Sequence, residues 1–351
     1  MHIVKIVLNE QRNVTLTAFL QDVGGEFRHI TKRPAVLVLP GGGYSMCSER
    51  EADPVALSYL QAGYQAFVLR YSVQEHAVWP NPLNDYEQAM ELICSKTDEW
   101  NIYPDKIAVI GFSAGGHLAA AAATIAKNKP CAVVLGYPAV EGDTIQHYQP
   151  TAPDMVSAID YNTSPCFVFA TRTDNIVPIS NTLNFTRALA ENGISFESHI
   201  YAYGPHGFSV DNSSVVTSDT RICDRVPNWV SDSIGWLKDM LGDFAEGAMT
   251  EPKCGKRIND NSAEYLSVDC TIGCLMSNAQ ARAILQPMMA AAQEKVAQRY
   301  GDRAPKVEDA SQVADNAMAM NMTLRAALSY GKMPDQVVDQ LNAALNRIPN
   351  N

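Results

Sequence analysis

The sequence predicts an α/β fold with a mostly parallel sheet, followed by a small domain made only of helices. Three observations predict it. Short apolar runs alternate with longer runs of helical period, glycine-rich turns follow two of the apolar runs, and the alternation stops near residue 244. Strands that alternate with helices form parallel sheets covered by helices on both faces. The 351 residues allow one large and one small domain.

Apolar runs in the first part of the chain predict about eight strands. Residues 1–20 alternate apolar and polar side chains, which predicts two strands joined by a turn. The other six predicted strands span residues 33–40, 65–73, 106–112, 131–138, 165–171 and 196–204.

The helices predicted between these strands have apolar residues three and four positions apart. Gly63 and Gly193 mark the ends of two of them, because glycine favours the helix C-terminus. The predicted helices span residues 53–63, 83–100, 114–128, 180–193 and 226–241.

The pattern changes after Phe244. A polar segment with glycine and proline follows, and helical patterns alone come after it, at residues 278–300, 312–331 and 334–348. We therefore predict three parts. They are a main domain over residues 1–246, a linker over residues 247–265 and a small helical domain over residues 266–351.

The composition excludes several classes of protein. Hydrophobic residues make up 46% of the chain, which is ordinary for a globular protein with a buried core. The formal net charge is −11, so a basic face for nucleic acid or anionic lipid is not expected. The first residues have no basic n-region, apolar h-region or cleavage site, and no apolar run is long enough for a membrane span. We expect a cytoplasmic protein, provided that no signal peptide precedes this sequence.

The cysteines and histidines do not have the spacing of a metal site. Eight cysteines include no CxxC pair, and Cys131 and Cys166 lie in apolar strands, where a thiol behaves as a small buried hydrophobe. We predict no metal site and no disulfide framework.

Gly111 to Gly115 form a G-x-S-x-G pentapeptide between a predicted strand and a predicted helix. A strained strand-to-helix turn of this kind raises the serine hydroxyl above the sheet, and side chains at the flanking glycines would collide. Ser113 is therefore the candidate nucleophile. The alternative is an ordinary turn with an incidental serine.

A serine nucleophile needs a base and an acid that orients the base. In this architecture the chain order is Ser, Asp or Glu, then His. Asp174 follows one predicted strand and His206 follows the last one, at the edge where parallel sheets form their sites. We predict that Asp174 and His206 complete a triad with Ser113.

Other acids and histidines fit these roles less well. Asp154 and Asp160 do not directly follow a clear strand. His199 lies within a predicted strand as a packed or surface residue, and we expect a structural role for His117 on the helix after Ser113.

The run LPGGGY at residues 39–44 suits an oxyanion hole, the set of N–H donors that stabilises the charged oxygen formed during acyl transfer. One donor is the amide after the nucleophile, here Ala114, and the other comes from a glycine-rich loop after an earlier strand. Gly42 and Gly43 are the candidates. A phosphate-binding loop would need a following Gly-Lys-Ser/Thr, which is missing; a plain turn is the remaining alternative.

Residues 1 to about 241 resemble the α/β-hydrolase superfamily. The match is closer still to the cytoplasmic bacterial acetyl-xylan esterases and acetylesterases, through the runs LPGGGY, VIGFSAGGHLAA, TDNIVPISNTLNF and GPHGFSV. Lipase-like relatives begin the glycine loop with His, whereas this chain has Pro40. Tyr44 N–H is therefore an alternative to one of the two glycine donors.

The tail is similar to a short helical module appended to some glycan-degrading enzymes, which favours a carbohydrate-linked role. We expect it to bury its apolar stripes against the main domain or a second copy of the chain, the latter giving a homo-oligomer.

The resemblance implies a serine esterase that removes short acyl groups, acetyl above all, from a small-molecule ester or an acetylated oligosaccharide, without a cofactor. A peptidase or formamidase with the same triad is one alternative, because fold does not fix substrate. An inactive hydrolase fold that serves as a binding module is the other.

Overall fold

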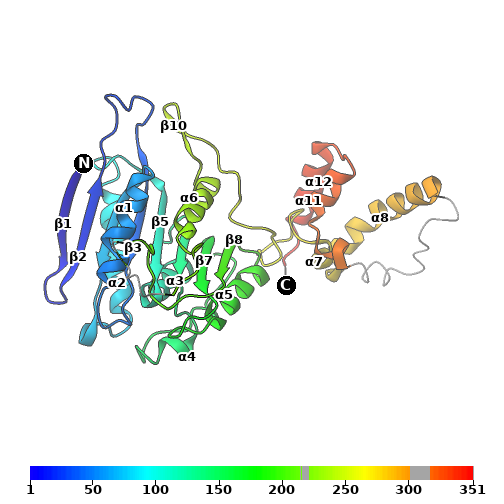
Figure 1. The fold of residues 1–351 in the computed structure, drawn as a ribbon. Helices are drawn as coiled ribbons and strands as arrows, with labels where there is room; N and C mark the ends of the chain where they lie inside the picture. Colours follow the sequence, from blue (N-terminus) through cyan, green and yellow to red (C-terminus); the bar gives the residue numbers. More distant parts are fainter. Residues whose placement is uncertain (214, 216–220, 301–316, 351) are drawn as a thin grey trace. The chain divides into compact units, whose positions relative to one another are not determined.

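The computed structural model describes residues 1–213, 215, 221–300 and 317–350 (Figure 1). The chain divides into two compact units, Met1–Lys256 and Arg257–Asn351. The division lies inside the segment 247–265, which the sequence analysis assigns to a linker.

Eight described strands of the first unit form one sheet in the order β1-β2-β4-β3-β5-β6-β7-β8. The neighbours from β4 onward in this order pair in parallel. The pairs β1–β2 and β2–β4 are antiparallel. This confirms the predicted fold class. The strands are β1 (His2–Asn9), β2 (Val14–Leu20), β3 (Arg33–Leu39), β4 (Gln65–Arg70), β5 (Ile102–Phe112), β6 (Val133–Gly136), β7 (Cys166–Thr171) and β8 (Phe196–Tyr201).

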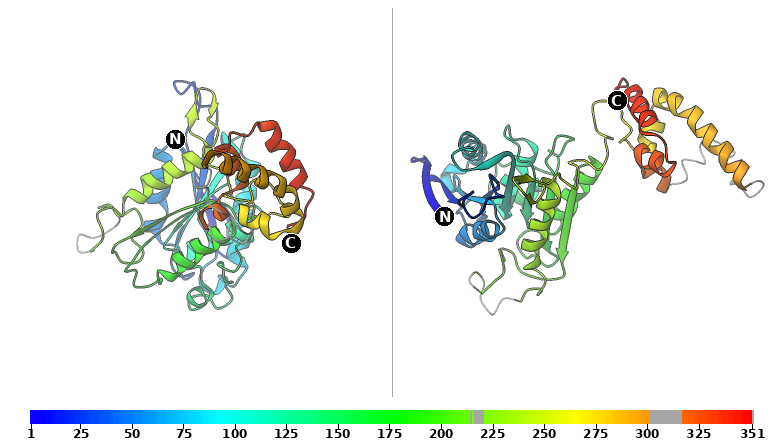
Figure 2. Two further views of the ribbon diagram at one scale, coloured as in Figure 1. Left: turned by 90° about the vertical axis from the view of Figure 1, so that its right-hand side faces the viewer. Right: turned by 90° about the horizontal axis from the view of Figure 1, so that it is seen from above.

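Helices cover both faces of this sheet (Figure 2). Side chains alternate along β3, so Leu37 joins one buried cluster and Val36 joins the other. The Leu37 cluster includes residues of α2 (Asn81–Ser95), α3 (Ser113–Thr124) and α5 (Ser180–Glu191), and the Val36 cluster includes residues of α1 (Asp53–Gln61) and α6 (Asn228–Leu241).

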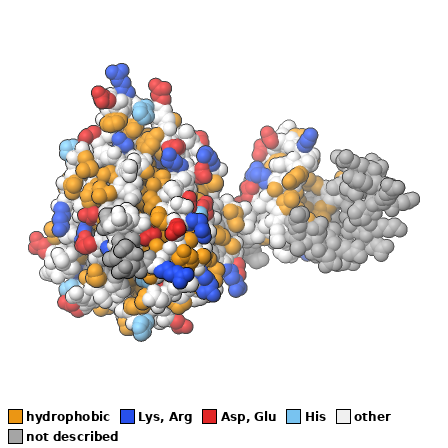
Figure 3. All heavy atoms as spheres, in the orientation of Figure 1, with side chains coloured by type: hydrophobic (Ala, Val, Ile, Leu, Met, Phe, Trp, Pro, Cys, Tyr) orange, Lys and Arg blue, Asp and Glu red, His pale blue; other side chains and the backbone are white. Residues whose placement is uncertain are grey.

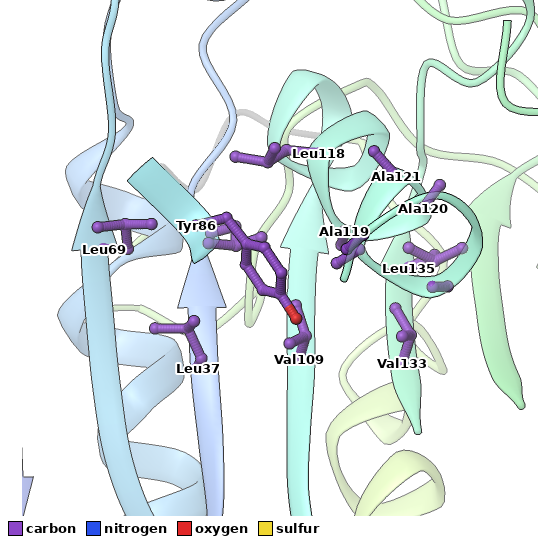
Figure 4. Close-up of a cluster of buried hydrophobic side chains, with 14 of the residues drawn as sticks. Leu37, Leu69, Tyr86, Val109, Leu118, Ala119, Ala120, Ala121, Val133 and Leu135 are labelled. Atoms are coloured by element: carbon purple, nitrogen blue, oxygen red, sulfur yellow. The ribbon is translucent and has the colours of Figure 1, made fainter. Parts of the chain in front are cut away.

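The centre of the Leu37 cluster is a close contact between α3 and the sheet. Ala119 to Ala123 are fully buried there, because small side chains let the helix approach its neighbours. Figure 4 shows Tyr86 of α2 beside these alanines, over Val109 of β5. The helix that begins at Ser113 is thus held firmly against the core.

The carboxyl ends of the parallel strands meet at one edge of the sheet, where α/β proteins form their sites. The residues after β3 form the glycine loop and the short 3₁₀ helix η1 (Glu49–Glu51). The residues after β6 lead to α4 (Gly142–Ile145). The residues after β5, β7 and β8 carry Ser113, Asp174 and His206.

The segment after α6 stays bound to the first unit. Its strands β9 (Phe244–Ala245) and β10 (Ala248–Met249) pair with each other. Further on, Lys253 N–H donates to Asp239 O at 2.7 Å, and Ser195 N–H donates to Lys256 O at 3.1 Å. The first ten residues of the expected linker are therefore part of the first unit.

The second unit is helical around a buried cluster that includes Leu266, Leu275 and Leu345. Within the predicted helix 312–331, a break at Met322 and Thr323 separates two helices, and residues 312–316 lie outside the described residues. Thr323 caps the second of these, since its Oγ1 accepts Ala326 N–H. The helices are α7 (Ile272–Ser277), α8 (Ala279–Tyr300), α10 (Ala317–Asn321), α11 (Leu324–Tyr330) and α12 (Asp335–Leu345).

Among the described residues, no helix is long and apolar enough to cross a membrane. Within the same ranges, no group of three or more His, Cys, Asp or Glu side chains is arranged to hold a metal ion. Lys and Arg side chains are interspersed with Asp and Glu side chains on the face shown in Figure 3.

Candidate active site

Ser113 lies at the sharp turn between β5 and α3. Its φ of +53° is in the left-handed region, which costs a non-glycine residue energy and marks a strained turn. The flanking glycines are required by close contact. A Cβ at Gly111 would lie 2.2 Å from Gly115 O, and a Cβ at Gly115 would lie 2.2 Å from Leu39 O.

The structure brings the three predicted triad residues together. Ser113 Oγ lies 2.8 Å from His206 Nε2, and His206 Nδ1 lies 2.7 Å from Asp174 Oδ2. Both distances are those of good hydrogen bonds. The three side chains come from different loops at the same edge of the sheet, in the chain order that the sequence analysis expects.

Asp174 is held from the side opposite to His206. Its Oδ1 accepts the N–H groups of Ile176 at 2.8 Å and Val177 at 2.9 Å. The Asp174 side chain is 1% exposed and that of His206 is 14% exposed. The carboxylate is therefore fixed by backbone donors, while the imidazole keeps access to solvent.

The rival acids stay in their own loops. Asp154 accepts the N–H groups of Gly142 and Ser157, and Asp160 accepts the Asn162 N–H. Within the part of the chain that the structure describes, neither carboxylate is hydrogen-bonded to a histidine.

The rival histidines are also engaged elsewhere. His199 Nε2 lies 2.7 Å from Glu197 Oε1 on the same strand. His117 is fully buried, with Tyr44 Oη 2.8 Å from its Nδ1 and Pro153 O 2.8 Å from its Nε2. Burial lowers the pKa of His117 to about 4, so its ring is neutral at physiological pH. This fits the structural role expected for His117.

The glycine loop lines the pocket in front of Ser113. Gly42 has a φ of +128°, and a Cβ there would lie 2.3 Å from Met46 O, so only glycine fits. Among the described residues, the amides of Gly42, Gly43 and Ala114 have no hydrogen-bond partner. These three residues line the same pocket as Ser113 and His206.

Tyr44, the alternative donor, is buried behind the loop. Its side chain is part of the main core and its hydroxyl contacts His117. Tyr71 O–H supports the loop from the same side by donating to Pro40 O at 2.5 Å. The described residues that line the pocket include Gly42 and Gly43 but not Tyr44. The Tyr44 N–H stays an alternative donor.

Two buried residues behind the site were missed by the sequence analysis. Glu51 Oε2 accepts Gly41 N–H at 2.8 Å, and its Oε1 accepts Tyr137 O–H at 2.6 Å. The Tyr137 ring packs edge-on against the His206 ring, with centroids 4.8 Å apart. Glu51 lies in a charged run with Glu49 and Arg50 that reads as solvent-exposed, so only the tertiary structure identifies it.

The pocket above Ser113 has a volume of about 410 Å³ and is open to solvent. Apolar side chains form much of its wall, including Met46, Tyr148 and Ile176. The Tyr148 ring lies over Gly43, where an added Cβ would be 3.4 Å from Tyr148 Cδ1. Tyr148 is 40% exposed, so its ring is available to a ligand.

Comparisons with known proteins show what the chain is similar to. The BD-FAE family model matches residues 27–149. Xylanase B (endo-1,4-beta-xylanase) of Butyrivibrio fibrisolvens is 31% identical over 211 residues, which are 52% of this chain and 33% of that protein. The acetylxylan esterase of Xylanibacter ruminicola is 27% identical over 196 residues, 50% of this chain and 41% of that protein. The chain thus spans less than half the length of these two relatives.

The crystal structure of MGS-M1, an α/β hydrolase from a Medee basin deep-sea metagenome library, matches about two thirds of this chain. It is 48% identical, with a TM-score of 0.64, and the alignment covers 69% of this chain and 98% of that one. On this match, together with the sheet order and the strained serine turn, the chain belongs to the α/β-hydrolase superfamily.

Proposed function

We propose that this chain is a serine carboxylesterase that removes short acyl groups, acetyl above all, from sugar or xylo-oligosaccharide esters. The observation that carries the proposal is the continuous set of contacts from Ser113 Oγ through His206 to Asp174. A hydroxyl next to an imidazole that a buried carboxylate orients is the arrangement that acyl transfer to serine requires.

In the proposed reaction, Ser113 Oγ attacks the ester carbonyl while His206 Nε2 takes the hydroxyl proton. The tetrahedral intermediate then collapses, the carbon–oxygen bond to the alcohol breaks, and His206 returns the proton to that alcohol. Water, deprotonated by His206, attacks the acyl-enzyme in the same way and releases the acid. Asp174 keeps the imidazole in the tautomer that accepts the proton. The cycle is complete without a cofactor.

The amides of Gly42, Gly43 and Ala114 are proposed to hold the oxyanion. They line the Ser113 pocket and have no partner among the described residues. N–H donors fixed in advance stabilise the charge that develops on the carbonyl oxygen, and the loss of one such donor costs on the order of 100-fold to 1000-fold in kcat.

The sugar preference is proposed from two features. The pocket offers an exposed aromatic ring, Tyr148, next to the glycine loop, and apolar and aromatic walls with a few polar groups are typical of small-molecule sites. Two of the matching relatives are a xylanase and an acetylxylan esterase. Both features point to an acylated carbohydrate as the substrate.

A panel of acetylated xylo-oligosaccharides, p-nitrophenyl esters of two to eight carbons and peptide or formyl amides tests the proposal, with released acid and amine measured in parallel. We expect acetate release from the sugar esters and falling kcat/KM with acyl length. Faster turnover of the amides would favour a peptidase or formamidase, and no turnover of any substrate would favour a binding module.

A further inference from the structure

Glu51 is a buried carboxylate shared by two loops of the candidate site. It is 3% exposed, although it lies on the short helix η1. Gly41 N–H donates to its Oε2 and Tyr137 O–H donates to its Oε1, while the Tyr137 oxygen accepts the Ser209 N–H at 3.1 Å. Hydrogen bonds donated to a carboxylate favour its ionised form. Burial of such a charge is tolerated only with these bonds in place.

The contact to Gly41 connects Glu51 to the nucleophile. A Cβ at Gly41 would lie 2.7 Å from Glu51 Oε2 and 2.9 Å from Ser113 Cβ. The Gly41 backbone thus lies between the carboxylate and the serine, directly before Gly42 and Gly43. Glu51 is therefore bonded to the residue that directly precedes the amides facing the pocket.

The contact to Tyr137 connects Glu51 to the histidine. The two rings of Tyr137 and His206 meet edge-on at 4.8 Å, and Ser209, which donates to the Tyr137 oxygen, belongs to the same loop as His206. Tyr137 has a φ of +36°, a conformation that persists in a non-glycine residue only where the surroundings impose it.

We propose that Glu51 is a positioning residue for the ester hydrolysis proposed above. It holds the glycine loop against Ser113 and, through Tyr137, supports His206, while its negative charge stabilises the imidazolium that forms when Ser113 attacks. The inference rests on the proposed function, because it assigns Glu51 a part in that same reaction.

The charges around the site agree with this role. Burial raises the pKa of Glu51 above its ordinary value, and the Tyr137 hydroxyl, the Gly41 amide and the His206 charge oppose that rise only in part. The attraction between Glu51 and a protonated His206 is reciprocal. Among the described residues, the charged or titratable groups that face these two residues include Asp174, Tyr137, Arg50 and Tyr71.

The test is Glu51→Gln in the full chain, with kcat and KM for p-nitrophenyl acetate measured from pH 5 to pH 9. The variant keeps the shape but loses the charge, and one of its two donors then faces an amide NH₂ group. We expect kcat to fall about 10-fold to 100-fold, with KM changed less than about threefold. We expect the acid limb of kcat/KM to move to lower pH by about half a unit, because the imidazolium loses a favourable charge.

Asp53→Asn is the matched control. Asp53 is the next carboxylate along the chain, lies 47% exposed at the start of α1 and pairs with Arg70. Its loss should change kcat/KM less than about twofold, because solvent screens an exposed charge. A purely structural role for Glu51 would lower the melting temperature without moving the acid limb.

Tyr137→Phe is a second variant that tests the same inference if Glu51→Gln does not fold. It keeps the ring against His206 and removes only the hydroxyl, so kcat should fall and the acid limb should move in the same direction. A folded variant with wild-type kcat and an unchanged pH profile would overturn the inference. A wild-type protein that hydrolyses no ester would overturn the proposed function first, and the role of Glu51 with it.

Discussion

At the scale of single residues, the candidate site is made of side chains and amides whose conformations are fixed by their surroundings. Ser113 is held in a strained turn, Asp174 is fixed by two amides, and the glycine amides face a pocket rather than a partner. Catalysis of acyl transfer depends on such preorganisation, because donors already in place cost no rearrangement in the transition state.

Tyr148 offers a prediction about substrate class. Tyr148→Ala removes the ring next to Gly43 and leaves the triad intact. We expect KM for acetylated xylo-oligosaccharides to rise about 10-fold, since aromatic contacts are worth roughly 0.5–1.5 kcal/mol beyond the buried area. KM for p-nitrophenyl acetate, which has no sugar ring, should change less than about twofold. Equal losses on both substrates would contradict a sugar-binding role.

His117 predicts a dependence of stability on pH. Its pKa is about 4 in the folded protein, below the ordinary value of about 6.5, so the unfolded chain binds the proton more readily. The free energy of unfolding should therefore fall as the pH drops from about 6.5 to 4, with His117 contributing up to about 3 kcal/mol of the loss.

Urea unfolding of the wild type and of His117→Gln at pH 8 and pH 5 checks this. The variant should be less stable at pH 8 but should lose less stability on acidification. His147→Gln, at an exposed position, is the control and should follow the wild type. Parallel losses in the wild type and His117→Gln would count against the buried neutral histidine as the cause.

At the scale of elements, the close approach of α3 to the end of β3 sets the distance between the nucleophile and the glycine loop. A Cβ at Gly115 would lie 2.2 Å from Leu39 O and 2.4 Å from Pro40 O. No side-chain rotation relieves a collision with backbone atoms, so the two elements would have to separate.

Gly115→Ala should thus lower stability by about 2 kcal/mol or more and reduce ester hydrolysis together with it. Gly235→Ala is the matched control, because Gly235 lies in α6 with open space around its would-be Cβ. There the same change should stabilise the protein by up to about 1 kcal/mol, through better helix propensity. Thermal unfolding of the two variants decides the matter, and similar melting temperatures would refute the argument.

The elements that could be predicted from the sequence are those with a strong local pattern. The strands of the main sheet and the helices α1, α2, α3, α5 and α6 follow from apolar periodicity, and Ser113 follows from its two glycines. The short helix α4 and the strands β9 and β10 were not predicted. Glu51 and Tyr137 could not be predicted in this way, because their roles depend on a contact between two residues that are 86 positions apart in the sequence. The break between α10 and α11 was missed for a similar reason, since Thr323 pairs with Thr271 from another part of the unit.

At the scale of the whole molecule, the division into two units predicts where the chain can be shortened. Residues 247–256 bind the first unit through Lys253, Gly255 and Lys256. A chain that ends at Lys256 should keep the wild-type kcat/KM for p-nitrophenyl acetate, because every candidate site residue precedes it. A chain that ends at Glu246 should have a lower melting temperature, since Ser195 and Asp239 lose their backbone partners.

The same pair of chains tests the tail. Mass in solution, measured by light scattering, shows whether residues 257–351 are needed for an oligomer, which is one of the two arrangements that the sequence analysis leaves open. An unchanged oligomeric state would remove that role. A folded but inactive chain ending at Lys256 would mean that the tail takes part in forming the site.

The central claim is that Ser113 is a nucleophile activated by His206 and Asp174. Labelling of the full chain with a fluorophosphonate, followed by peptide mass spectrometry, tests it most directly, because the probe bonds only to an activated hydroxyl. We expect a single adduct on Ser113 in the wild type, loss of that adduct in His206→Ala, and ester hydrolysis that disappears in proportion to labelling. An adduct on another residue, or full hydrolysis by a completely labelled protein, would contradict the account.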